Sequence, residues 1–126
     1  MKKIFLAIAL IALSCLSLKA QNVNVSASAG SSSGSYPTLK DAFAAINSGT
    51  HQGNIVLTLV GNTTETGQAL LLNGATAPAS FTSVRIVPSG ARLVQGNFGS
   101  VLIDLQGADN VTIDGLNDGA NSLTLE

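Results

Sequence analysis

The chain of 126 residues is poor in charge, in aromatic rings and in cysteine. Charged residues make up 10% of the chain and aromatic residues 4%, with no tryptophan. Nucleic-acid binding depends on Lys and Arg that neutralise phosphates, so six such residues against seven acids argue against a nucleic-acid partner. The scarcity of aromatic rings argues against the stacking platforms on which sugar rings often pack.

Long apolar runs are missing as well. Nothing after Ala20 approaches the ~18 continuous apolar residues that cross a membrane. The segment from Met1 to Ala20 has the pattern of a secretory signal peptide: Lys2 and Lys3, an apolar run over positions 4–13, and a cleavage site at Ala20. We therefore expect a protein that is secreted or displayed on the outer cell surface, without a transmembrane helix.

The single cysteine, Cys15, falls inside this signal. Cleavage after Ala20 would leave a mature chain without cysteine, so disulfides would not stabilise it. Three basic residues would then face seven acidic ones. An alternative interpretation treats residues 12–15 as a lipoprotein box, in which Cys15 is acylated and becomes the first mature residue.

One amphipathic helix is predicted near the start of the mature chain. Residues 21–35, rich in Ser, Gly and Ala, precede it as a short strand or a flexible segment. Thr38 is the expected N-cap, Asp41 follows three residues later, and Gly49 lies just past the end. Its apolar face is formed by Leu39, Ala42, Phe43 and Ile46. A helix with one apolar face must pack against other elements.

The rest of the chain reads as short strands separated by turns rich in Gly, Asn, Asp and Ser. Many short strands fit either a sandwich or barrel, or a parallel β-helix. The predicted strands cover residues 55–60, 69–72, 84–87, 92–94, 101–105, 111–113 and 123–125.

A fixed interval favours the β-helix. The triplets 57–59, 84–86 and 111–113 are apolar–polar–apolar, and the interval from the first to the second equals the interval from the second to the third. An interval such as the one from position 57 to 84, and again from 84 to 111, is typical of the repeats of a stacked solenoid. We therefore predict an all-β fold, a right-handed parallel β-helix over residues 36–126 with the helix as its N-terminal cap. The expected inward columns are Leu57, Val84 and Val111, and Leu59, Ile86 and Ile113; the outward row is Thr58, Arg85 and Thr112.

The far end of this predicted solenoid carries no cap in the sequence. The last strand is followed directly by Glu126. This pattern predicts that the β-helix is incomplete at Glu126. An uncapped coil exposes unpaired backbone, so self-association through it is a further expectation.

Three stretches carry a resemblance to a known family: YPTLKDAFAAINSG (residues 36–49), IVLTLVGNTTET (55–66) and LIDLQGADNVTIDGL (102–116). The chain from Tyr36 to Glu126 resembles the start of large secreted β-helix proteins of the pectin-lyase-like superfamily, especially bacterial surface proteins exported by the type IX secretion route. The resemblance implies a β-helix scaffold with a structural or adhesive role. The C-terminal sorting domain of those proteins is absent from this sequence.

Four aspartates are the candidate catalytic acids, since sugar cleavage requires paired carboxylates or an acidic metal cluster with a basic partner. Asp109 and Asp118 fall in predicted turns, where an Asp side chain commonly bonds its own backbone. Asp104 and Asp114 fall at strand ends, where we expect solvation. No catalytic residue is predicted.

Two other groups resemble sites without completing one. Residues 114–119, DGLNDG, resemble a calcium loop, but Leu116 stands where a ligand is needed. His51, the only histidine, has no second ligand for a metal and is expected beside the last carbonyls of the helix. The sequence therefore predicts no metal site and no cofactor.

These observations predict a secreted or cell-surface structural, adhesin-like module that is noncatalytic. Thr58, Arg85 and Thr112 form its candidate binding stripe, and a surface polysaccharide or a protein is the expected ligand. The alternative is the N-terminal part of a polysaccharide-degrading lyase or hydrolase whose active coils lie beyond Glu126.

Overall fold

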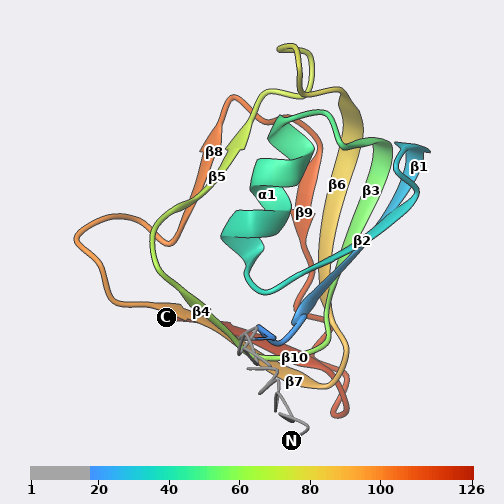
Figure 1. Cartoon of the computed structure of the whole chain (residues 1–126). Helices are drawn as coiled ribbons and strands as arrows, with labels where there is room; N and C mark the ends of the chain where they lie inside the picture. Colours follow the sequence, from blue (N-terminus) through green and yellow to red (C-terminus); the bar gives the residue numbers. More distant parts are fainter. Residues whose placement is uncertain (1–17) are drawn as a thin grey trace, which may run out of the picture.

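The computed structural model describes residues 18–126, and the predicted apolar run of the signal peptide and Cys15 lie outside the described residues. The described chain forms one helix and ten strands, arranged as sheets of five, three and two strands (Figure 1). In chain order the elements are β1 (Val23–Gly30), β2 (Ser33–Tyr36), α1 (Leu39–Asn47), β3 (His51–Leu59), β4 (Thr63–Glu65), β5 (Ala69–Leu72), β6 (Phe81–Pro88), β7 (Ala91–Gly96), β8 (Ile103–Gln106), β9 (Val111–Ile113) and β10 (Ser122–Leu125).

The largest sheet is mixed, with the strand order β2-β1-β3-β6-β9. In it β1 runs antiparallel to both β2 and β3, whereas β3, β6 and β9 run parallel to one another. The second sheet, β10-β7-β4, and the third, β5-β8, are parallel. The region predicted as a short strand or a flexible segment therefore holds one strand, β1, and most of a second, β2.

The predicted fold class, an all-β parallel β-helix, is wrong. Nearly half of the described residues are in strands, but the strands form three small separate sheets, and the largest is mixed because β1 runs antiparallel to β2 and β3. The helix contributes buried side chains to the same core as the sheets. The architecture is a small, mostly β domain with one short helix.

The register predicted from the equal spacing of the triplets is wrong as well. Val84 lies beside Val111, as predicted, but Leu57 lies beside Ile86 instead of Val84. Side chains in a strand alternate between two faces, so a slip of two positions leaves each of them on its predicted face while changing its neighbour. Leu57 and Val84 are both buried, yet they do not form the predicted column.

The helix prediction is confirmed. Thr38 is the N-cap of α1, and its Oγ1 accepts the Asp41 N–H at 3.1 Å. The predicted apolar face is buried and packs into a core shared with all three sheets. That core contains Val23, Val25, Leu39, Ala42, Phe43, Ile46, Ile55, Leu57, Leu59, Ala69, Leu71, Val84, Ile86 and Val94.

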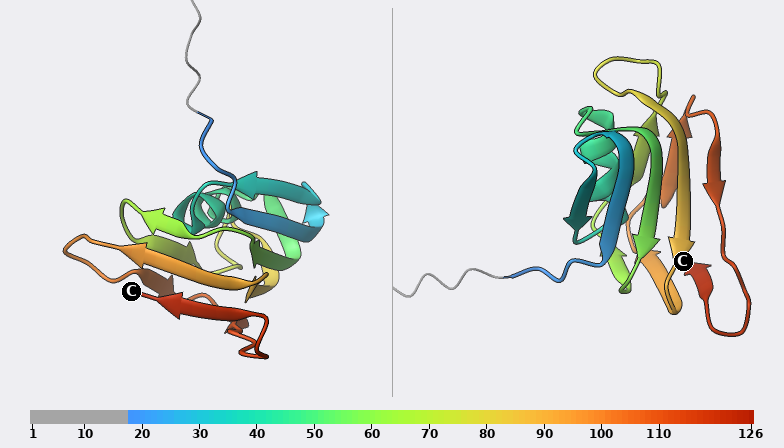
Figure 2. Two further views of the ribbon diagram at one scale, coloured as in Figure 1. Left: turned by 90° about the horizontal axis from the view of Figure 1, so that it is seen from below. Right: turned by 90° about the vertical axis from the view of Figure 1, so that its right-hand side faces the viewer.

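The two ends of the domain differ. The helix lies at the end formed by the earlier part of the chain, and β8, β9 and β10 lie at the opposite end (Figure 2). Asn47, the last residue of α1, donates its Nδ2–H to the Leu70 carbonyl at 2.8 Å and accepts the Leu72 N–H at 3.0 Å. The side-chain amide thus bonds β5 as a neighbouring strand would. The free edge of β5 is covered from this side.

Candidate functional site

A polar surface covers the outer side of the five-stranded sheet. The inward residues in the middle of β1, β3 and β6 are buried, and the alternate residues are exposed or half-buried. We call this surface the polar face; it is formed by Asn24, Ser26, Ser33, Ser35, Asn54, Val56, Thr58, Ser83, Arg85, Val87 and Thr112. Most of these side chains are short and carry a hydroxyl or an amide.

The structure brings together two of the three residues of the predicted stripe. Arg85 and Thr112 are partners in the β6–β9 register, and both are exposed. Thr58 is half-buried and lies beside Val87, whereas Val56 stands next to Arg85. The actual row across the three strands is therefore Val56, Arg85 and Thr112. The sequence alternation already marks Val56 as outward, but the assumption of equal steps along the chain selects Thr58.

Hydrogen bonds between neighbouring strands order the polar face. Ser35 Oγ donates to Asn24 Oδ1 at 2.9 Å, and Ser83 Oγ donates to Asn54 Oδ1 at 3.0 Å. Each bond joins residues that face one another in the register. The amide N–H groups of these Asn side chains stay available, because the bonds use only the amide oxygen.

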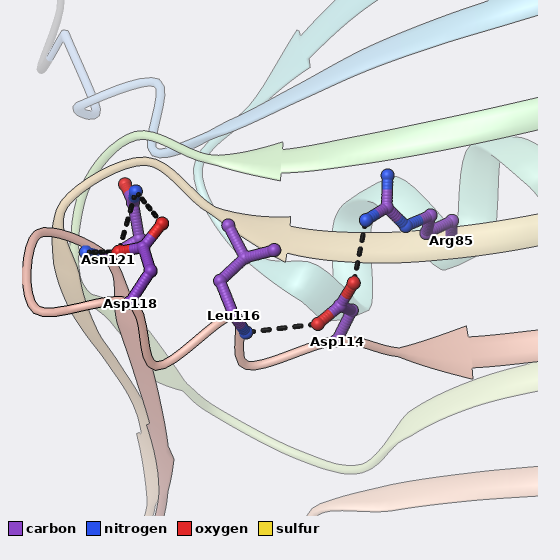
Figure 3. Close-up of polar contacts among 5 residues, drawn as sticks. All are labelled: Arg85, Asp114, Leu116, Asp118 and Asn121. Atoms are coloured by element: carbon purple, nitrogen blue, oxygen red, sulfur yellow. Dashed lines mark hydrogen bonds and ion pairs between the residues drawn. The ribbon is translucent and has the colours of Figure 1, made fainter.

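An ion pair lies at the edge of the polar face. Arg85 Nη2 donates to Asp114 Oδ2 at 2.6 Å, and Asp114 Oδ1 accepts the Leu116 N–H at 3.0 Å (Figure 3). The Arg85 bond, followed by the Leu116 N–H, holds the pKa of Asp114 below its usual range. The Arg85 and Asp114 side chains are 50% and 35% exposed, so solvent screens the pair.

The predicted calcium-like segment forms a self-bonded turn. Asp118 accepts hydrogen bonds from the backbone N–H groups of Ala120 and Asn121 and from the Asn121 side chain. These bonds, led by the Asn121 side chain, lower the pKa of Asp118. The two acids of the segment therefore bond different groups: Asp114 bonds Arg85 and the Leu116 N–H, whereas Asp118 bonds Asn121 (Figure 3). Among residues 18–126 no three His, Cys, Asp or Glu side chains gather in a way that could hold a metal ion.

The expectation for Asp118, a side chain bonded to its own turn, is confirmed. Asp104 is not simply solvated: it is half-buried and accepts from Gln68 Nε2 at 2.6 Å and from Gln106 Nε2 at 3.3 Å. Asp109 is exposed. The groups that donate to Asp104 and Asp118 are all neutral.

His51 does not lie against the helix carbonyls. It begins β3, is 1% exposed, and bonds Ser31 O through Nδ1 at 2.6 Å and the Tyr36 hydroxyl through Nε2 at 2.8 Å. A carbonyl only accepts, so Nδ1 carries a proton and donates it to Ser31 O. Burial raises the pKa of Tyr36. The pair joins β2 and β3 and has a structural role.

Sequence reasoning missed one buried acid. Glu65, in β4, is 2% exposed, and its two carboxylate oxygens accept the N–H groups of Leu39 at 2.9 Å and Lys40 at 3.0 Å. The carboxylate thus binds the first turn of α1, where the helix dipole favours negative charge. Residues 63–65, Thr-Thr-Glu, are all polar, so no alternation in the sequence marks Glu65 as inward-facing.

A surface hollow of about 290 Å³ lies away from the polar face. It is lined by Thr64, Gln95, Gly96, Asn97 and Glu126 at the second sheet. Of these, Gln95 donates to Thr64 at 3.3 Å across β4 and β7. The exposed Gln95 therefore serves as a reference position outside the polar face.

Comparison with family models, curated proteins and solved structures finds no match for this chain. The resemblance to the pectin-lyase-like superfamily stays a prediction. Within the described residues, no helix has the length and apolar character required to cross a membrane.

Proposed function

We propose that this chain is a noncatalytic structural and adhesive module, exported after cleavage near Ala20, whose polar face binds an extended polysaccharide. The observation that carries the proposal is the array of short hydroxyl and amide side chains on one face of the five-stranded sheet. Ser, Thr and Asn lose little conformational entropy on binding compared with long side chains. Such an array provides many hydrogen bonds at a small ordering cost.

The spacing of the polar face suits a repeating polymer. Neighbouring strands lie about 4.8 Å apart, and residues on one face of a strand recur at about 7 Å. Hydroxyl groups along an extended sugar chain can therefore meet one polar side chain after another. Asn24 and Asn54 each keep amide donors free for a ligand.

The centre of the polar face is less polar. Val56, 36% exposed, lies diagonally next to Val87, because Val56 pairs with Arg85 and Thr58 pairs with Val87. The C–H groups of a sugar ring can pack on these methyl groups while its hydroxyls bond the polar residues around them. This arrangement supports a polysaccharide more than a charged ligand, since Arg85 is already paired with Asp114.

Binding to cellulose, chitin, xylan and pectin tests the proposal. We expect the full chain to bind at least one of these polymers, and the substitution Val56→Lys to weaken that binding at least tenfold. Gln95→Lys, an exposed change on the second sheet, is the matched control and leaves binding unchanged. Binding to none of the four polymers, or an equal loss in both variants, contradicts the proposal.

A further inference from the structure

The end of the domain opposite to α1 exposes the continuation of its core. Leu105, Ile113 and Leu125 pair in register with Leu71, Ile86 and Val94, respectively. The three inner partners are at most 1% exposed, whereas the three outer residues are 41%, 40% and 43% exposed. Burial therefore stops abruptly at β8, β9 and β10. We call the surface of Leu105, Ile113 and Leu125 the open end.

Two further apolar side chains, next to β8 and β9 in the sequence, are exposed. Val101, just before β8, is 56% exposed, and Leu116, just after β9, is 40% exposed. Exposed apolar groups on this scale are typical of an interaction surface. The strands β8 and β9 pair beside Leu71 and Ile86, but no further strand of the described chain lies beside β8 and β9 in the same way.

The backbone at the open end is also unpaired on one side. Strands β8, β9 and β10 are the outermost members of their three sheets in the described chain. Edge strands with free N–H and C=O groups pair readily with a further strand. The opposite end lacks this property over β5, where Asn47 occupies the edge. A polypeptide in extended conformation therefore fits the open end.

The charge around the open end selects among polypeptides. Residues 101–126 contain five acidic residues and no Lys or Arg; the acids are Asp104, Asp109, Asp114, Asp118 and Glu126. Arg85, from the neighbouring strand, neutralises only Asp114. A second copy approaching through the same end would bring five acids against five. Like charges placed across an interface disfavour association, whereas complementary charges favour it.

We propose that the open end binds an extended segment of a cationic polypeptide, which adds a strand to one of its edges. Alternate apolar side chains of the segment cover Ile113 and its apolar neighbours, and Lys or Arg side chains between them face the surrounding acids. Backbone hydrogen bonds provide affinity, and the charge provides specificity. This partner is distinct from the polysaccharide that we propose for the polar face. The polar face is the outer side of the five-stranded sheet, whereas the open end is formed by the edge strands β8, β9 and β10.

Two nine-residue peptides test the proposal, one of alternating Lys and Val and one of alternating Glu and Val, each labelled for fluorescence anisotropy. We expect the full chain to bind the Lys–Val peptide and to bind the Glu–Val peptide at least tenfold more weakly. Because screening weakens exposed charge interactions, the affinity for the Lys–Val peptide falls several-fold in about 0.5 M NaCl.

Substitutions locate the binding surface. Ile113→Lys and Leu125→Lys each place a cation at the open end, and each weakens Lys–Val binding at least tenfold. Val56→Lys makes the same kind of change on the polar face and leaves peptide binding unchanged, whereas Ile113→Lys leaves polysaccharide binding unchanged. The two proposals therefore fail separately. Circular dichroism checks that each variant is folded. If one of the two open-end variants does not fold, the other still tests the surface.

Three results would overturn the inference. The first is equal binding of the two peptides, which would remove the role of charge. The second is a loss of peptide binding in Val56→Lys as large as that in Ile113→Lys. The third is a dimer in sedimentation analysis that Ile113→Lys dissociates, because the occupant of the open end would then be a second copy.

Discussion

Asp114 shows how a single side chain ties the last part of the chain to the sheet. Its two oxygens bond groups of different kinds, the guanidinium of Arg85 and the N–H of Leu116. Both favour the charged carboxylate, which is why the pKa of Asp114 is lowered. A lowered pKa in the folded chain means that this contribution to stability is fully present above the ordinary pKa of an aspartate. It is lost as the pH falls through the lowered value.

Removal of the guanidinium should raise this pKa. In Arg85→Met we expect the pKa of Asp114 to move up towards, but not fully to, its usual range, since the Leu116 N–H still bonds the carboxylate. NMR titration of the side-chain carboxyl carbons measures the change. Asp118 is the internal control, because its lowered pKa depends on Asn121 and Ala120 and not on Arg85. An unchanged Asp114 pKa in the variant contradicts the assignment of Arg85 as the main cause.

At the residue scale, the sequence predicts local chemistry better than long-range contacts. The turn role of Asp118 follows from neighbours two and three positions away, and it is confirmed. His51 and Glu65 bond residues that are 15 to 26 positions distant. No local pattern encodes such distances. A charged residue in a polar segment gives no sign that a helix terminus will lie against it.

At the scale of elements, the first turn of α1 is bonded by β4 as well as by its own N-cap. The carboxylate of Glu65 satisfies two N–H groups that every helix leaves without an internal partner in its first turn. It does so while buried, where a missing hydrogen bond costs more than at the surface. The position of the helix against the sheets is therefore fixed by this carboxylate as well as by its apolar face.

The substitution Glu65→Gln tests this role. A glutamine offers one acceptor oxygen and places an NH₂ group against an N–H donor, so we expect unfolding in urea to require about 1–3 kcal/mol less free energy. Glu126→Gln, at the only other glutamate of the chain, is exposed and should change stability little. Equal stability of the Glu65 variant and the native chain would show that the carboxylate does not hold the helix.

The elements that the sequence predicts are those with strong patterns. The helix has an N-cap, one apolar face and a glycine after its end, and the seven predicted strands have runs of Val, Ile and Leu; all of these are present. The strands β2 and β4 were not predicted. They consist largely of Ser, Gly and Thr, and their conformation comes from pairing with β1 and β7. Tertiary pairing, rather than intrinsic preference, forms such strands.

At the scale of the whole molecule, packing weakens from the α1 end to the open end. Ile86 and Ile113 are the same residue type in adjacent, paired strands, but they are 1% and 40% exposed. We expect Ile86→Ala to lower the free energy of unfolding by about 2–5 kcal/mol and Ile113→Ala by about 1 kcal/mol. Urea denaturation of the two variants measures the difference. Equal losses would mean that Ile113 is covered to the same degree in solution, for example by a bound partner or a second copy.

The overall architecture was the least predictable level. A repeated apolar–polar–apolar triplet indicates which residues face inward, and this part of the sequence pattern is correct for Leu57 and Val84. It does not fix the register, because a slip of two positions leaves every side chain on the same face. Nor does it indicate strand direction. The tight connection between β1 and β2 and the antiparallel pairing of β1 with β3 have no counterpart in the repeat, so the solenoid prediction failed.

The amide of Asn47 has a consequence for any larger structure that contains this domain. An ordered row of subunits grows only when each member can both receive a neighbour and be received by one. Here the side chain occupies the strand edge that a following subunit would need, while the other side of the domain stays receptive. At β5, therefore, a row of subunits could not continue through this edge, because the hydrogen bonds that a further strand would make to Leu70 and Leu72 are already made by Asn47.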